Sequence, residues 1–572
     1  MERRVLLAIF LAFLTLYLWQ AVVMPPPEPV AEDAAAATAA APPTTAASVP
    51  TRPESTAPQA VDAASTPVVG ESGERDIRVE TDQVIVTFTN RGARLKSWQF
   101  KKHRDASGQP FELVVTEAPD KQPLPFSLRV DDSAATRTLN DALYAVRGSA
   151  PSGVVSSPTQ IAFEYRDNGG LRAVKEFQIE PASYVLSLRS EVYQGDRPLA
   201  AAIEWGPGLG KEPSATGSYI LQPEGIVSIA DDEERIPAAS VAEQPTRQGD
   251  FQFAGIEDHY FIAVALSPGS STITFQPVTG PPLPGEEQGR PLMNFILQPG
   301  KQGEPLRFYL GPKDFDQLAA VDRSLVRTIN FGMFAVLVVP LLRALNWVND
   351  FVGNYGWSII LLTILINAVM FPLRHKSVVS MRKMQEIQPE AKAIQDRYKN
   401  LKSTDPAKQK MNQELMTLYR ERGVNPASGC VPMLLTLPVL LAFYSLLSTA
   451  IELRGAPFIG WIHDLSRYDP YYVTPVLMGI TQVWQTRITP QTGVDPAQQK
   501  LMMFMPVIFM FFFLWAPSGV AIYWFMSNLW GIGQQYLTNY LIGPPKIHTV
   551  RSPAERRVKK VGSGKTDAAA EK

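Results

Sequence analysis

Five apolar runs in the second half of this chain are close to the length that crosses a lipid bilayer. About 20 apolar residues in a helix span the hydrocarbon core, so each run predicts a transmembrane helix. The last two runs are separated only by a turn at Pro517, which predicts a tight hairpin. The runs cover residues 357–373, 431–450, 472–487, 501–516 and 518–542.

A sixth apolar run, residues 5–23, follows Arg3 and Arg4 near the N-terminus. The apolar part of a signal peptide is usually about 7–15 residues long. This longer run favours an uncleaved anchor over residues 1–23, and a cleaved signal peptide is the alternative. Residues 24–73 are rich in Pro, Ala and Thr, which predicts a disordered linker.

Residues 74–320 show the alternation of apolar and polar positions that is typical of β-strands. Val84, Val86 and Phe88, for example, fall on one side of such a strand. Gly, Pro, Asp and Asn break the apolar runs at short intervals. Many short strands without a helical period predict an all-β sandwich. Its function is open: scaffolding or partner docking is favoured over carbohydrate binding.

Residues 323–353 are apolar but interrupted by polar positions. The run 331–342 contains Gly332 and Pro340 and is shorter than a span, and Arg343 begins a polar side. This pattern predicts an amphipathic helix in the plane of the membrane interface. If the segment crossed the bilayer, every later segment would lie on the opposite side, so the charges of the loops test the assignment.

Lysine and arginine are unevenly distributed among the loops. They are dense in residues 374–428 and in the tail 543–572, whereas the loop 451–471 contains only Arg454 and Arg467. Cytoplasmic segments of membrane proteins carry the excess of Lys and Arg. The pattern predicts six transmembrane helices in a bacterial inner membrane, with both termini in the cytoplasm and the β domain in the periplasm.

The basic segment 374–428 repeats apolar positions at spacings of three and four on both sides of Asp405-Pro406, which favours a turn. It predicts a cytoplasmic helical hairpin, and the short loop 488–500 lies on the same side. The hairpin is either a solvated coiled coil or a docking site for the ribosome, for anionic phospholipids or for a nascent chain, and these interpretations are compatible. The residues assigned to docking are Arg382, Lys383, Lys392 and Arg397.

Composition adds no catalytic chemistry to this picture. The single cysteine, Cys430, excludes an internal disulfide, and the five histidines are scattered without metal-ligand spacing. No GxSxG or HExxH motif is present. We therefore expect no metal, no cofactor and no enzymatic activity.

Two of the predicted spans, 472–487 and 501–516, are short. A helix of this length extends about 24 Å, against about 30 Å for the hydrocarbon core. The first of them also contains Thr474, Gln482 and Gln485. Short and partly polar spans favour a wet cavity among the helices over ordinary variation in span length.

Several short motifs lie in and beside the predicted spans. They are Phe351-Val-Gly-Asn354, Met370-Phe-Pro-Leu373, Gly429-Cys-Val-Pro432, Trp461-Ile-His-Asp-Leu465, Asp469-Pro-Tyr-Tyr472, Phe504-Met-Pro-Val507 and Phe513-Leu-Trp-Ala-Pro-Ser-Gly519. As a set, across residues 349–541, these motifs resemble the YidC/Oxa family of membrane protein insertases. The order of segments, from N-terminal anchor to basic tail, is similar to that of Gram-negative bacterial members with a large periplasmic domain, which implies the inner membrane of a Gram-negative bacterium.

The resemblance implies a periplasmic β-supersandwich and five core membrane helices around a hydrophilic groove open to the cytoplasm and to lipid. A client's polar segment would enter the groove without nucleotide, which avoids several kcal/mol for each polar group left unsatisfied in hydrocarbon. Nascent membrane proteins are the implied substrates, and the Sec translocon is an implied partner. The implied client-contacting residues are Thr363, Asn367, Thr436, Leu437, Leu440, Phe512, Phe513, Tyr523 and Trp524.

Asn367 departs from the family pattern. The resemblance implies an arginine at this position, and no Lys or Arg replaces it within residues 357–373. We expect Asn367 to face the wet groove, because a polar side chain that faces lipid is costly. Without a cation in this span, the groove is expected to attract acidic client segments more weakly.

Two other functions fit parts of the sequence. A secondary transporter with a periplasmic ligand-binding domain would need ionisable residues in its spans and often shows a repeat, but the spans have almost none and no evident repeat. A membrane-anchored enzyme acting on envelope carbohydrate would need paired carboxylates, whose convergence one sequence does not reveal. The insertase is the leading hypothesis.

Overall fold

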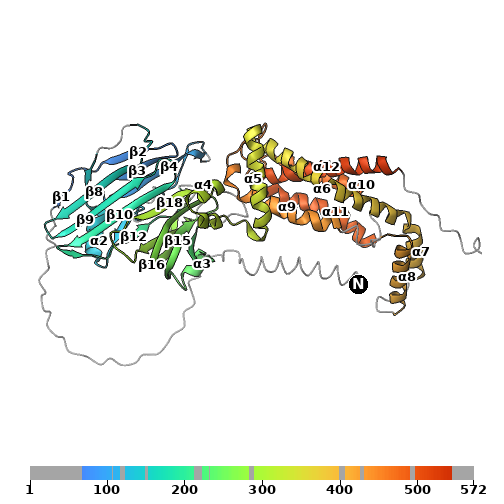
Figure 1. Cartoon of the computed structure of the whole chain (residues 1–572), viewed down its shortest axis with the longest axis horizontal. Helices are drawn as coiled ribbons and strands as arrows, with labels where there is room; N and C mark the ends of the chain where they lie inside the picture. Colours follow the sequence, from blue (N-terminus) through green and yellow to red (C-terminus); the bar gives the residue numbers. More distant parts are fainter. Residues whose placement is uncertain are drawn as a thin grey trace, which may run out of the picture. The chain divides into compact units, whose positions relative to one another are not determined.

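The structure is a computed structural model. The predicted anchor 1–23, most of the linker 24–73 and nearly all of the tail 543–572 lie outside the described residues. A β-rich region is followed by a helical region, which confirms the predicted division of the chain (Figure 1). The structure describes residues 67–543 except for 106, 116–122, 149–152, 211–221, 231, 283–288, 399–405, 425–430 and 490–495.

The β-rich region consists of two antiparallel sheets. The strands are β1 (Pro67–Val69), β2 (Asp76–Glu80), β3 (Val84–Thr89), β4 (Arg94–Arg104), β5 (Pro110–Glu112), β6 (Ser127–Arg129), β7 (Ala145–Arg147), β8 (Thr159–Asp167), β9 (Leu171–Ile179), β10 (Val185–Gln194), β11 (Arg197–Pro198), β12 (Ala202–Trp205), β13 (Glu224–Ile229), β14 (Asp232–Ile236), β15 (Thr246–Glu257), β16 (Phe261–Pro282), β17 (Gly289–Gln298) and β18 (Leu306–Pro312). The smaller sheet has the order β2-β3-β4-β5. The main path of the larger sheet is β1-β8-β9-β10-β18-β16-β15-β13-β14, and its long strands lie side by side in Figure 1.

The alternation read from the sequence produces the core of this region. Val84, Val86 and Phe88 of β3 are fully buried, as predicted. The Phe88 ring lies 4.6 Å from that of Phe177 in β9, so apolar faces of the two sheets meet there. The region begins earlier than residue 74, because β1 already pairs with β8. Two short helices that the pattern did not predict, α2 (Ser133–Asp141) and α3 (Ala238–Val241), interrupt the strands.

A buried lysine ties the two sheets together. Lys175 projects from β9 of the larger sheet and is fully buried. Its ammonium group donates hydrogen bonds to the carbonyl oxygens of Gly92 (2.7 Å), Ala93 (3.0 Å) and Phe126 (2.7 Å). Gly92 and Ala93 form the turn between β3 and β4 of the smaller sheet. Three backbone acceptors compensate for the loss of water around this charge.

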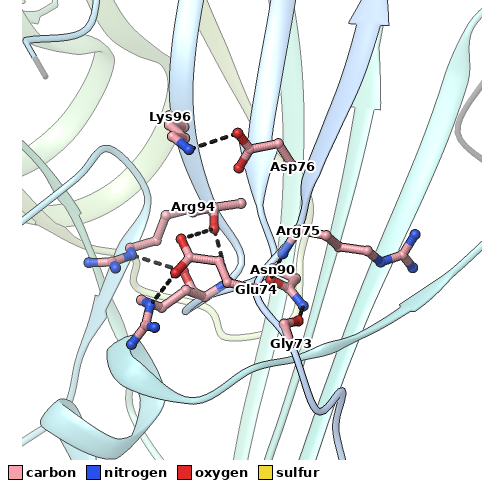
Figure 2. Close-up of polar contacts among 9 residues, drawn as sticks. Gly73, Glu74, Arg75, Asp76, Asn90, Arg94 and Lys96 are labelled. Carbon is pink, nitrogen blue, oxygen red and sulfur yellow. Dashed lines mark hydrogen bonds and ion pairs between the residues drawn. The ribbon is translucent and has the colours of Figure 1, made fainter.

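Figure 2 shows the polar contacts where the chain enters the smaller sheet. The buried Asn90 side chain accepts from the Arg75 amide (2.9 Å) and donates to the Gly73 carbonyl oxygen (3.0 Å). Nearby, Lys96 pairs with Asp76 at 2.7 Å on the surface. Surface ion pairs contribute at most about 1 kcal/mol. The buried Asn90 side chain therefore does more than the Lys96–Asp76 ion pair to hold the start of β2 against the end of β3.

A buried charge cluster marks the end of the β-rich region. Glu257 accepts from Arg235 at 2.8 Å and pairs with Lys313 at 2.6 Å. Arg235 also donates to the carbonyl oxygens of Arg327 and Thr328 (both 3.2 Å), which belong to the segment that leaves the β-rich region. Burial raises the pKa of the neighbouring Glu224 to about 7, and the charge of Glu257 acts in the same direction.

The helical region follows the predicted order of segments with shifted boundaries. The predicted interfacial segment consists of two short 3-10 turns followed by one 18-residue α-helix, and the helix of the first predicted span continues to Glu386. The helices are α4 (Phe315–Val321), η1 (Arg323–Thr328), η2 (Gly332–Phe334), α5 (Ala335–Val352), α6 (Tyr355–Glu386), α7 (Gln388–Arg397), α8 (Ala407–Glu421), α9 (Val431–Thr449), η4 (Ile451–Leu453), α10 (Val473–Ile488), α11 (Pro496–Phe512), η5 (Phe513–Trp515) and α12 (Ser518–Ile542).

The turn from α5 into α6 explains the sequence motif Phe351-Val-Gly-Asn354. Gly353 ends α5 with a positive φ of 68°, a conformation that glycine adopts without steric cost. The side chain of the next residue, Asn354, accepts hydrogen bonds from the amides of Gly356 (3.0 Å) and Trp357 (3.2 Å). Such a cap satisfies amides that a helix start otherwise leaves without partners. The pair Gly353-Asn354 thus ends one helix and starts the next.

Candidate functional site

Polar side chains are buried between α6, α10 and α12. Each is at most 6% exposed although the helices are largely apolar. A polar side chain that faces lipid is costly, so such residues turn toward neighbouring helices. We call this set the polar seam. Its members are Thr363, Asn367, Thr481, Asn528, Gln534, Gln535 and Thr538.

On α6 the seam is a chain of hydrogen bonds along one helix face. The Thr363 hydroxyl donates to the Ile359 carbonyl oxygen at 2.6 Å. The Asn367 amide nitrogen donates to the Thr363 carbonyl oxygen at 2.8 Å. Arg374 then donates from Nη1 to the Asn367 Oδ1 at 2.7 Å. These bonds connect an arginine at the end of the predicted span to its buried middle.

Between α10 and α12 the seam crosses from helix to helix. The Asn528 amide nitrogen donates to the Met478 carbonyl oxygen and to the Thr481 Oγ1, both at 3.2 Å. Trp524 donates from Nε1 to the Gln482 Oε1 at 3.0 Å. Interhelical bonds of this kind contribute about 1–2 kcal/mol each in model peptides and less in folded membrane proteins.

Glycine allows this close approach of α10 and α12. A Cβ atom at Gly531 would lie 2.3 Å from the Gln485 Nε2 of α10, so the amide end of that side chain would have to move. At Gly533, by contrast, a Cβ atom would meet nothing within 4 Å. Small residues at helix contacts let backbones approach in this way.

The C-terminal halves of α6 and α12 are joined by further polar contacts. A ring nitrogen of His375 lies 3.2 Å from the Thr538 Oγ1. Arg382 donates from Nη2 to the Asn539 Oδ1 at 2.8 Å and also bonds to the Gly543 carbonyl oxygen. The Gln534 amide nitrogen donates to the Phe371 carbonyl oxygen at 3.4 Å.

The chemistry available at the seam is hydrogen bonding. Its members are hydroxyls and amides, and the five predicted spans contain no Asp or Glu in the sequence. Among the described residues, no group of three His, Cys, Asp or Glu side chains could hold a metal ion. The seam residues can donate and accept hydrogen bonds, but they include none of the paired carboxylates or acid–base groups that hydrolysis requires.

Comparison with known proteins decides the family. A model described as "YidC periplasmic domain" matches residues 76–344, and one described as "60Kd inner membrane protein" matches residues 347–544. A membrane protein insertase YidC from Syntrophus aciditrophicus (strain SB) is 34% identical over 83% of this chain and 87% of the relative. One from Geobacter metallireducens is 34% identical over 94% of this chain and 98% of the relative. This chain belongs to the YidC family.

A solved structure in the same family is also similar. It is an active YidC insertase with the first transmembrane domain resolved, which is 20% identical and covers 83% of this chain and 95% of that chain, with a TM-score of 0.34. The family assignment rests on the sequence matches and not on this superposition. The resemblance drawn from the short motifs is confirmed, and so is the assignment of the β-rich region to the YidC periplasmic domain.

The structure separates the predicted client-contacting residues into two groups. Thr363 and Asn367 belong to the seam, and Tyr523 is buried with its ring stacked 4.3 Å from that of Phe443. The partly buried Trp524 contacts the buried Phe513, with the ring centroids 4.8 Å apart. The remaining described residues are less buried: Leu437 and Phe512 are exposed, and Leu440 is partly buried. The Thr436 side chain lies outside the described part of the chain.

The predicted docking residues also differ in their surroundings. Lys383, Lys392 and Arg397 are exposed on α6 and α7. Arg397 pairs with Glu414 of α8 at 2.7 Å. Arg382 is only 8% exposed and is bonded to α12, so it holds two helices together instead of contributing to an exposed docking surface.

Sequence reasoning did not single out the seam residues of α12. Asn528, Gly531, Gln535 and Thr538 follow one another at spacings of three and four, which places them on one helix face. A polar stripe in an apolar helix is the signal that would have identified them. Arg374 was missed because it lies just beyond the predicted span.

Replacing Gly531 tests the close approach of α10 and α12. We expect Gly531→Val to destabilise the protein by about 1 kcal/mol, the low end of the range for overpacking, because the amide end of Gln485 has to move out of its place. Gly533→Val is the matched control, with the same substitution on the same helix where space is open. Thermal unfolding in detergent measures the difference. Equal destabilisation by both variants would contradict the proposed contact.

Proposed function

We propose that this chain inserts client proteins into the bacterial inner membrane by admitting their polar segments to the polar seam. Its membership of a family whose relatives are named membrane protein insertases supports the activity. The observation that carries the mechanism is the burial of hydroxyls and amides between helices whose outer faces are apolar. Val369 and Phe504, for example, are exposed large apolar residues on α6 and α11.

The free energies favour such a path. Each polar group that enters hydrocarbon without a partner costs several kcal/mol. Seam amides and hydroxyls offer replacement hydrogen bonds while a client's polar segment passes. The client's apolar segment meanwhile moves along exposed apolar helix faces into lipid, where burial gains about 25 cal/mol per Å² of apolar surface. Transfer driven in this way needs no nucleotide and no chemical step.

Six transmembrane helices with both termini in the cytoplasm are part of the proposal. By length and composition alone, Gly332–Val352 and Tyr355–Glu386 are both long and apolar enough to cross a membrane. Leu437–Thr449 and Met503–Trp515 are shorter apolar helices. We assign Gly332–Val352 to the interface, because a crossing there would place the basic α7 and α8 on the same side as the β-rich region, against the positive-inside rule.

We also propose that α7 and α8 form a cytoplasmic hairpin that meets the ribosome and anionic phospholipids. Ion pairs between Arg397 and Glu414 and between Arg422 and Glu390, both 2.7 Å, support their pairing. The exposed Lys383 and Lys392 leave positive charge on the outer surface. Nascent membrane proteins are the proposed clients, and the Sec translocon is a proposed partner for some of them.

The topology is tested by labelling single cysteines from either side of the membrane. Cys430 is the only cysteine, so Cys430→Ser provides a clean background. We expect Lys392→Cys on α7 to react only from the cytoplasm and Ser157→Cys in the β-rich region only from the periplasm. Both positions reacting from the same side would mean that Gly332–Val352 crosses the bilayer.

The insertase activity is tested in liposomes that contain only this protein. A small single-span client should become protected from protease well above the level in empty liposomes, without nucleotide. Circular dichroism of the proteoliposomes shows that the protein is folded. Protection no better than in empty liposomes would contradict autonomous insertion, and the secondary transporter would become the leading alternative.

A further inference from the structure

Large apolar side chains are exposed on the loop between α9 and α10. Ile462 and Leu465 of this loop turn inward and are buried, as apolar residues of a folded loop usually do. A second set points outward, and Tyr471 is 69% exposed. We call this second set the aromatic platform. Its members are Ile459, Trp461, Tyr468, Tyr471 and Tyr472.

A buried carboxylate holds the platform in shape. Asp469 is only 1% exposed, and its Oδ1 accepts a hydrogen bond from the Trp461 Nε1 at 2.9 Å. It also accepts from the amides of Tyr471 (3.0 Å) and Thr474 (2.8 Å). The rings of Trp461 and Tyr471 meet edge to face, with their centroids 6.0 Å apart. Three donors compensate for the burial of the carboxylate, so these two rings are fixed relative to each other.

The loop is attached to one end of the helical region. The amide of Ser518, the first residue of α12, donates to the Arg467 carbonyl oxygen at 2.7 Å. The side chain of Asn354, which caps the start of α6, donates to the Pro457 carbonyl oxygen at 3.1 Å. Directly after the loop, α10 begins at Val473. The platform therefore lies where α6, α10 and α12 begin, whereas the basic α7 follows the other end of α6.

Exposed aromatic residues continue from the loop toward α5. Trp357, in the first turn of α6, is exposed, and its ring centroid lies 5.4 Å from that of Phe458 in the loop. Trp347 and Phe351 near the end of α5 are exposed as well, with their ring centroids 5.0 Å apart. Because α5 is the helix that we assign to the membrane interface, the platform extends an interfacial surface.

We propose that the aromatic platform binds the boundary between lipid headgroups and acyl chains, and that it fixes the depth at which α10 and α12 begin. Trp and Tyr favour this boundary, because their rings are apolar and their N–H or O–H groups stay hydrated. Charge does not select the partner: residues 451–471 contain two basic and three acidic side chains. The inference rests on the arrangement of spans in the proposed function and extends it, but it does not require client insertion.

The test measures the depth of the loop by fluorescence quenching in phosphatidylcholine liposomes. A bimane label is placed at Tyr471→Cys or Ile459→Cys in the Cys430→Ser background. The lipids carry bromine either near the headgroup end of the acyl chain or near its far end. We expect both labels to be quenched at least about twofold more by the shallow bromine than by the deep one, because the platform lies at the boundary.

Two positions calibrate the depth scale. Leu365 is exposed near the middle of the predicted span 357–373, so a label at Leu365→Cys should be quenched more by the deep bromine. Ser157 is exposed in the β-rich region, so a label at Ser157→Cys should be quenched by neither. Labels at 459 and 471 that behave like the one at 157 would overturn the inference, and so would labels that behave like the one at 365.

Asp469→Ala tests whether the buried carboxylate shapes the platform. It should lower the shallow quenching at 471 by at least about twofold, because Trp461 and the Tyr471 amide lose their acceptor. Asp464→Ala is the matched control: it removes the same charge from the same loop, but Asp464 bonds to Ser466 and pairs with Arg467. Equal loss with both variants would overturn the role of Asp469. If Asp469→Ala does not fold, Trp461→Phe, which removes the donor and keeps a ring, should lower the quenching in its place.

The protein-to-lipid ratio separates lipid from a protein partner. Shallow quenching at 471 should be the same when this ratio is lowered tenfold. Quenching that appears only in the dilute sample would assign the platform to contacts between copies of this chain and overturn the inference. Brominated lipids lie in both leaflets and no client is present, so failure of the proposed topology or of client insertion would not change these results.

Discussion

Polar groups in the hydrocarbon layer must find partners inside the protein, and the helical region is organised by this constraint. An unsatisfied polar group costs several kcal/mol there, more than most single packing contacts contribute. The amides of Asn367 and Asn528 are accordingly buried and bonded, while apolar side chains such as Phe512 occupy exposed positions. We propose that the polar groups hidden from lipid in this way also serve a client's polar segment.

Close helix contacts are the second requirement, because a hydrogen bond between helices needs backbones that approach one another. Gly531 has no side chain to keep α12 away from α10, and the turn at Gly353-Asn354 sets where α6 begins. The β-rich region satisfies its buried polar groups by its own contacts, with Lys175 between its sheets and Asn90 at the entry of the chain. In this account the β-rich region is a stable scaffold and client binding belongs to the helices.

Local patterns were enough to predict the order of segments. The apolar runs between residues 357 and 542 lie in helices where the structure describes them, and the alternation at Val84, Val86 and Phe88 forms a buried strand face. Partners between distant segments could not be predicted, because periodicity describes one helix or strand at a time. Arg382 was assigned to docking because of its charge. In the structure it is buried and donates a hydrogen bond to α12. Arg374 was overlooked because a span was defined by its apolar residues, whereas α6 continues through it.

Photo-crosslinking from α12 tests the central claim, that the seam receives the polar segment of a client. A photoreactive amino acid at Gln535 lies in the seam, and one at the neighbouring Tyr536 lies on the exposed side of the same helix. During insertion, the account predicts that the client's polar segment crosslinks at 535 and its apolar segment at 536. Crosslinking of the polar segment at 536 but not at 535 would contradict the account.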